Sequence, residues 1–482
     1  MHLIVYFINS SSCILFTFST FVKYFFIHRI FRRILFPQLP ENLSYGYNRF
    51  MKKINHKRHK TWYKLDLSAN VYPTLQRKNF SNVYRISLSL KENVQPDILQ
   101  KALDLTLPRF PTFQVALRKG LFWRYLEANH RPGPFVREDI ENPCMPMHFK
   151  ANNRYLIRIY YYEKRISLEV FHSLSDGAGT LYFLKTLTAV YLRLLGHEIP
   201  NGEGVLDITE KPDSEEFEDA YLRYASSKVG RPRSQGNAYR VRGTKEPFYT
   251  LNIICGVIPV DKLRAVSKSY GVTVTEYLNA VLLYALLQKQ KCEKPFRERP
   301  VTLAMPVNLR SFFPSKTLRN FISMVYPSID PRMGDYTFEE ILVHVHNYMR
   351  YYINPKFLNA DIVTNASVQQ NPLIRIVPLF IKDFTVRKFY TNVQDGQSSA
   401  GLTNVGLTRL PMEMQPYVER FDVLMGQPFS ARTNCAIISY RNILTVNFTS
   451  SIKETDIERY FFRKLVQDGV PVKIETNRKM ED

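Results

Sequence analysis

The stretch Phe171-His172-Ser173-Leu174-Ser175-Asp176-Gly177 decides the fold, because two kinds of sequence pattern meet there. Upstream, residues 154–162 and 165–171 are two aromatic and β-branched runs with a short polar break between them, which is typical of a β-hairpin. Downstream, large apolar residues recur at helical spacing from Leu181 to Leu194 and stop before Gly196. We therefore expect the stretch to connect the end of a strand to the start of a helix.

The position of His172 in this stretch makes it a candidate functional residue. Chemistry is often carried at the end of a rigid element, where the scaffold fixes a side chain that still faces a cleft. A single histidine beside a loop aspartate is more often a surface or structurally satisfied residue. The combination of His172, Asp176 four residues later and Gly177 directly after it favours function.

The pattern resembles the H-x-x-x-D-G signature of the acyl-CoA-dependent acyltransferase and condensation superfamily. This superfamily contains chloramphenicol acetyltransferases, alcohol acyltransferases and the condensation domains of peptide synthetases. The resemblance covers roughly residues 60 to 475, and the second half looks especially like bacterial alcohol acetyltransferase-like proteins. It implies an α/β (α+β) fold with two chloramphenicol-acetyltransferase-like sandwich subdomains, which form a pseudo-dimer around a central cleft or tunnel.

The resemblance also implies roles for the signature residues. His172 is expected to be the general base, and a neutral imidazole with a pKa near 6.5 suits proton abstraction at cellular pH. Asp176 is expected to be structural and to pair with an arginine, for which Arg118 and Arg310 are both candidates. Gly177 leaves room for a ligand to approach the backbone.

Further segments resemble parts of the superfamily that line the cleft. Asn308 and Arg310 lie in Pro306-Val307-Asn308-Leu309-Arg310, and Ser323 closes an N-x-x-S segment further on; both segments lie where the two halves meet in the family. Asn404 belongs to a T-N-x-G segment opposite the histidine. We expect Asn404, Ser323 and Ser430 as candidate donors to the oxyanion that acyl transfer creates.

Two departures from the family pattern are visible. The residue before the base, often a second histidine, is Phe171, which argues against the peptide-synthetase type. The family's D-F-G-W-G motif has only a remote counterpart in residues 422–426.

The composition excludes several classes of protein. Hydrophobic residues make up 45% of the 482 residues, which is typical of a globular protein with a large core. Five scattered cysteines without a C-x-x-C pair indicate a reducing compartment and no zinc site. His344 and His346 are two apart on a predicted helix and so face different directions, and we expect no metal. The net charge of +23 favours anionic partners but does not identify their class. We do not expect a nucleic acid as a partner.

Residues 1–50 differ from the rest of the chain. Leu3 to Val22 contains no charge and basic residues follow, so the segment is a membrane span or an extension upstream of a true start at Met51. We favour the second interpretation, and we interpret the basic residues of 49–60 as a solvated tail. The expected location is the cytoplasm, with membrane association through the N-terminal segment as the alternative.

The chain divides into two similar halves. We expect an N-terminal subdomain over 51–205, a linker over 206–247, where acidic residues give way to a basic Gly/Pro/Ser stretch, and a C-terminal subdomain over 248–482. Capping boxes predict helix starts at Thr273 and Thr337.

These expectations combine into one function. The chain is predicted to move an acyl group, with acetyl favoured, from acyl-CoA as co-substrate to an alcohol, amine or lipid-linked acceptor. No covalent enzyme intermediate is implied. The alternatives are a condensation-type enzyme that takes its donor from a carrier protein, and a non-catalytic ligand- or lipid-binding member of the same fold.

Overall fold

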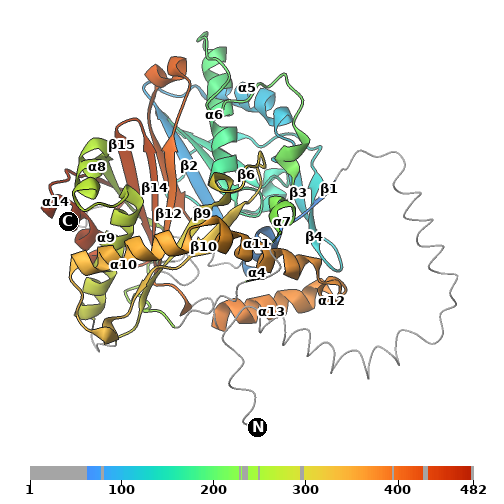
Figure 1. Cartoon of the computed structure of the whole chain (residues 1–482). Helices are drawn as coiled ribbons and strands as arrows, with labels where there is room; N and C mark the ends of the chain where they lie inside the picture. Colours follow the sequence, from blue (N-terminus) through green and yellow to red (C-terminus); the bar gives the residue numbers. More distant parts are fainter. Residues whose placement is uncertain are drawn as a thin grey trace, which may run out of the picture.

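The computed structural model describes residues 62–76, 81–226, 230, 237–247, 250–293, 298–392, 396–426 and 432–478. The expectations for residues 1–50, for the basic segment 49–60 and for Ser430 lie outside these ranges. The described chain forms two α/β halves around two large sheets, with a small third sheet at one side (Figure 1). This is the predicted mixed α/β class.

The first large sheet has five strands in the order β13-β2-β7-β6-β5. These strands are β2 (Val83–Leu90), β5 (Val136–Glu138), β6 (Ile157–Tyr162), β7 (Arg165–Phe171) and β13 (Val418–Met425). The hairpin predicted before the signature is formed by β6 and β7, with Ile157 opposite Val170 and Tyr162 opposite Arg165. Helices α5 (Pro96–Thr106) and α6 (Gly177–Leu194) pack against each other, and α6 contacts β2 and β7.

Helix α6 begins and ends where the sequence indicates. Asp176 is its N-cap, and its side chain accepts a hydrogen bond from the Gly179 amide. Gly196 follows the helix with φ +95°, a backbone conformation that side chains disfavour. The signature therefore connects the end of strand β7 to the first turn of α6.

The second large sheet has eight strands in the order β10-β9-β12-β14-β15-β8-β16, with β11 also paired to β9. These strands are β8 (Asn252–Pro259), β9 (Val301–Asn308), β10 (Ile322–Val325), β11 (Ser328–Ile329), β12 (Ala400–Thr408), β14 (Thr433–Tyr440), β15 (Ile443–Ser450) and β16 (Lys473–Thr476). Strand β12 is parallel to β9 and β14, while the other pairs are antiparallel.

Helices from the second half cover this sheet and extend below it in Figure 1. They are α8 (Val260–Ser269), α9 (Val274–Cys292), α10 (Phe338–Tyr352), α11 (Pro355–Gln370), α12 (Pro372–Arg375), α13 (Leu379–Asn392) and α14 (Asp456–Gln467). Helix α9 packs against β9, α10 and α14. Both predicted capping boxes, Thr273 with Glu276 and Thr337 with Glu340, are present.

The small sheet and the middle of the chain complete the fold. The small sheet is β1 (Trp62–Lys64), β4 (Arg124–Ala128) and β3 (Val115–Lys119), and β1 leads into helix α4 (Leu67–Leu75). Within the expected linker, the described residues include the short helix α7 (Ala220–Tyr224), which contacts α11. Glu216 of the same segment forms a buried ion pair with Arg109, so this part of the segment packs on the body of the protein.

No single helix among the described residues has the length and apolar content needed to cross a membrane. Helices α8 and α9 meet that test only as a pair, with a bend of 81° between them.

Strand β13 joins the two halves. It comes late in the chain but pairs antiparallel with β2, placing Val423 opposite Ile86 in the sheet of the first half. Phe421 is buried in the first-half core and meets the ring of Tyr440 from β14 edge-to-face at 5.4 Å. The core of the first half therefore extends through this strand onto the sheet of the second half.

We expect Phe421→Ala to lower the free energy of unfolding by about 3–5 kcal/mol, because the truncation leaves a cavity between both sheets. Urea unfolding followed by circular dichroism measures the change. Glu419→Ala, at an exposed position of the same strand, is the control and should unfold as the wild type does. Equal stability of both variants would contradict the bridging role of β13.

Candidate active site

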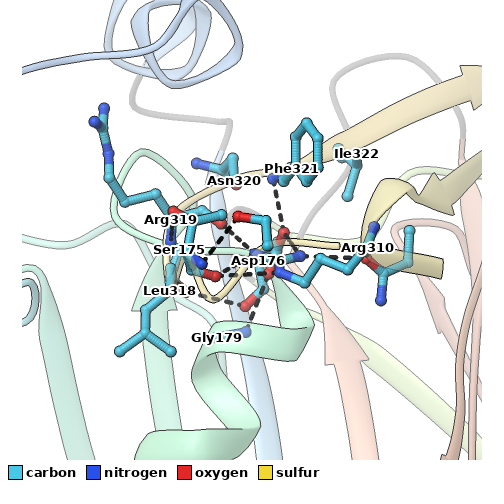
Figure 2. Close-up of polar contacts among 12 residues, drawn as sticks. Ser175, Asp176, Gly179, Arg310, Leu318, Arg319, Asn320, Phe321 and Ile322 are labelled. Atoms are coloured by element: carbon cyan, nitrogen blue, oxygen red, sulfur yellow. Dashed lines mark hydrogen bonds and ion pairs between the residues drawn. The ribbon is translucent and has the colours of Figure 1, made fainter. Parts of the chain in front are cut away.

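Asp176 ties the signature to the second half of the protein. Its Oδ1 accepts from the Gly179 amide at 3.1 Å, while its Oδ2 accepts from Arg310 Nη1 at 2.7 Å and from the Phe321 amide at 2.9 Å (Figure 2). The Asp176 side chain is 4% exposed. A carboxylate this well buried requires such a set of donors, because an unpaired buried charge is very unfavourable.

All three guanidinium nitrogens of Arg310 form hydrogen bonds in this arrangement. Its Nη1 contacts Asp176 and Asn308 Oδ1, its Nε donates to the carbonyl of Thr317, and its Nη2 donates to the carbonyls of Thr317 and Arg319. The guanidinium therefore holds the loop between β9 and β10 against the first turn of α6. Of the two arginines considered for Asp176, Arg310 forms the pair, and Arg118 pairs with Glu127 instead.

Two small groups let this loop approach closely. Ser175 Oγ donates to the Leu318 carbonyl at 2.6 Å. A Cβ atom added to Gly179 would lie 2.2 Å from the same carbonyl oxygen, so the position requires glycine. Gly177 has a different neighbour: an added Cβ would lie 3.7 Å from Val405 on β12, which brings that strand to the same end of α6.

His172 lies at the junction of the two halves and keeps an intermediate solvent exposure. Its ring stacks on Tyr72 of α4, with centroids 4.5 Å apart and an interplanar angle of 11°, and lies 4.8 Å from the ring of Tyr84 on β2. Its Nδ1 is 3.2 Å from Asn320 Oδ1, and Asn320 Nδ2 donates to the His172 carbonyl at 2.9 Å. The second bond orients the amide, so its oxygen faces the ring.

This arrangement fixes the tautomer of the neutral imidazole. An amide oxygen can only accept, so Nδ1 carries the proton and the lone pair lies on Nε2. Burial lowers the pKa of His172 from its ordinary value, while the Asp176 charge and nearby hydrogen-bonding oxygens oppose part of this effect. The ring is therefore neutral over a wider pH range than a free histidine, which is the state a general base needs.

Tyr84 contacts the signature through its hydroxyl group. Its hydroxyl donates to the Ser175 carbonyl at 3.0 Å and lies 2.5 Å from the Thr180 hydroxyl. Burial raises the pKa of Tyr84 well above its usual value, so the hydroxyl stays protonated and acts as a donor.

The other predicted residues are placed in different ways. Asn308 accepts from the Arg310 amide at 3.1 Å and so helps orient that arginine. Ser323 is buried, and its hydroxyl donates to Asp361 at 2.8 Å rather than toward the histidine. The Asn404 side chain donates to Thr275 at the start of α9 and accepts from the Gly406 amide.

Two residues around the base were not assigned a role from the sequence. Asn320 stands in the N-x-x-S segment, but nothing local shows that it contacts His172. Tyr72 lies on helix α4, far upstream of the signature, and nothing local to that helix indicates that it stacks on His172. Among the described residues, no group of three or more His, Cys, Asp or Glu side chains is arranged to hold a metal ion.

Comparison with solved structures shows that this architecture is known. The trichothecene 15-O-acetyltransferase TRI3 from Fusarium sporotrichioides superposes with a TM-score of 0.54 at 14% identity, covering 84% of this chain and 94% of that one. F. graminearum TRI101, solved with coenzyme A and deoxynivalenol, gives 0.57 at 10% identity, covering 85% and 99%. The condensation domain of the monacolin K synthase MokA gives 0.54 at 12%, covering 84% and 96%.

The chain thus has the fold of the CoA-dependent acyltransferase and condensation superfamily, with two sandwich subdomains arranged as a pseudo-dimer. A scan of protein-family models and a search of curated proteins gave no match to the sequence.

We expect Asp176→Asn to lower the free energy of unfolding by about 3–5 kcal/mol, because it leaves Arg310 buried without its counter-charge. The asparagine oxygen can still accept from the Gly179 amide and cap the helix, so the loss falls on the contacts of Oδ2 with Arg310 and the Phe321 amide. Thermal and urea unfolding measure the effect. Asp335→Asn removes the exposed Lys291–Asp335 pair and should change stability little. A similar small change at both positions would show that the central pair is not structural.

Proposed function

We propose that this protein transfers an acyl group from an acyl-CoA thioester to the hydroxyl or amine of a small acceptor, with His172 as general base. The observation that carries the proposal is the environment of His172. The ring is neutral, its Nδ1 faces the Asn320 side-chain oxygen, Nε2 therefore carries the lone pair, and the residue keeps intermediate solvent exposure at the junction of the halves.

The reaction follows from these properties. Nε2 removes the proton from the acceptor as its oxygen or nitrogen bonds to the thioester carbonyl carbon. The tetrahedral intermediate then collapses, the carbon–sulfur bond breaks, and the imidazolium returns its proton to the departing thiolate. The products are the acyl ester or amide and free CoA, and the enzyme is not acylated.

Two features support CoA as the donor. The net positive charge of the chain attracts phosphorylated substrates, although it does so without specificity. Proteins solved in this fold include TRI101 with coenzyme A and the starter condensation domain of the rhizomide synthetase RzmA with C8-CoA. Acetyl is the acyl group we favour, with an alcohol as acceptor.

We expect His172→Ala to reduce kcat by roughly 10²–10⁴-fold, the usual contribution of a positioned general base. The assay measures free thiol from acetyl-CoA, octanoyl-CoA and an acyl carrier protein thioester, each with a panel of alcohols and amines. His130→Ala, at an exposed histidine, is the matched control and should retain full activity. Full turnover by His172→Ala would contradict the assignment, and transfer only from the carrier protein would favour a condensation-type enzyme.

The pH dependence provides a separate test. Because burial lowers the pKa of His172, the acidic limb of kcat/KM should have its midpoint below about 6.5. Asn320→Asp places a carboxylate next to Nδ1, stabilises the imidazolium and should move this limb to higher pH. Rate measurements between pH 5 and pH 8 reveal the shift.

Asp66 requires a control in this experiment. It caps helix α4, which carries Tyr72, and lies 3.5 Å from Arg319, and burial raises its pKa to about 7. Asp66→Asn keeps the cap and removes the titration. A limb that moves in Asp66→Asn but not in Asn320→Asp would contradict the assignment of the limb to His172.

A further inference from the structure

A cavity of about 420 Å³ lies against helix α4, on the side turned away from the candidate base. Asn70, Val71 and Thr74 of α4 line it, whereas Tyr72 stacks on His172. With 3.6 residues per turn, Asn70 and Thr74 lie about 160° around the helix from Tyr72, and Val71 lies about 100° from it. The cavity is therefore separate from the His172 site, although the two share a wall.

The walls of this cavity are mainly apolar. Leu65 and Leu379 are buried, and Trp123 lies at the margin with 47% of its surface exposed. The remaining apolar lining comes from Phe122, Leu222, Ile374 and Val386. The volume falls in the range of roughly 300–1,000 Å³ that small-molecule sites occupy.

Three cationic side chains that line the cavity form no ion pair among the described residues. The half-buried Lys382 donates only to the carbonyls of Phe122, at 2.8 Å, and Arg375, at 3.5 Å. Over the described ranges, no ion pair involves Lys382, Lys64 or Arg375. Burial lowers the pKa of Lys382, and no neighbouring charge counters this effect.

Arg124 shows what a matched cation looks like in the same lining. It forms a 2.7 Å ion pair with Asp383, the single acidic residue among the described residues of the lining, and a hydrogen bond to Thr74. The lining therefore combines a large apolar area with an excess of positive charge, and Lys382 is more enclosed than Lys64 or Arg375, the other two cations outside an ion pair.

We propose that this cavity is a second ligand site, which takes an amphipathic anion: a chain of medium length with a terminal carboxylate. The hydrocarbon chain of the ligand fills the apolar space and is thereby removed from water. Its carboxylate lies beside Lys382, with Arg375 and Lys64 at the rim. This site is independent of the proposed acyl transfer and of the residues around His172.

The two tryptophans of the chain allow a direct measurement. Trp62 does not line the cavity, so Trp62→Phe leaves Trp123 as the only indole reporter. In this background we expect dodecanoate, below its micellar concentration, to change Trp123 emission in a saturable way. Dodecanol should bind more weakly, and dodecyltrimethylammonium should not bind at all.

Two variants test the site within the Trp62→Phe background. Lys382→Gln should weaken dodecanoate binding by roughly ten-fold, the usual effect of losing a charge-assisted hydrogen bond. Lys388→Gln, at an exposed lysine of the same helix outside the cavity, should leave binding unchanged. Val386→Phe should abolish binding of both the acid and the alcohol by filling the cavity, while thermal unfolding shows that the variant is folded.

Three results would overturn the proposal. The first is no saturable response to dodecanoate, and the second is an equal loss of affinity in Lys382→Gln and Lys388→Gln. The third is a response only to phosphatidylglycerol vesicles, which would identify the region as a membrane contact instead of a site for a single chain.

Discussion

The ion pair between Asp176 and Arg310 is the interaction on which the rest of the site depends. A buried pair contributes to stability only when both partners are well supplied with further hydrogen bonds. Here the carboxylate also accepts from the backbone of each half, and all the guanidinium nitrogens have acceptors. The pair places the loop that carries Asn320 beside His172. Asp176 therefore acts on His172 through the fold and through its charge, without contacting the ring.

The environment of the imidazole is assembled from distant parts of the chain. Tyr72 comes from the helix before the first large sheet, Tyr84 from the strand beside the signature, and Asn320 from the second half. Each contributes one property: a stacked face, a support for the loop, and a fixed tautomer. His172 has these properties only when the two halves are joined. This explains why neither half could hold the site alone.

The sequence was informative where structure is locally determined. The hairpin before the signature, the change from strand to helix at the signature and the starts of α9 and α10 follow from short-range patterns, and the structure confirms them. Local patterns could not choose between Arg118 and Arg310, because a pairing partner is set by the fold. Asn320 and Tyr72 were missed for the same reason. The hydroxyl of Ser323 donates to Asp361, a contact that no spacing rule could have indicated.

The position of β13 has a consequence for how this protein reaches its native state. During synthesis the edge of β2 emerges from the ribosome long before the strand that will pair with it. Until then the first half exposes an unpaired, largely apolar strand edge, the kind of surface that invites association between chains. We therefore expect the yield of folded protein on expression to depend on chaperone capacity more than its final stability suggests.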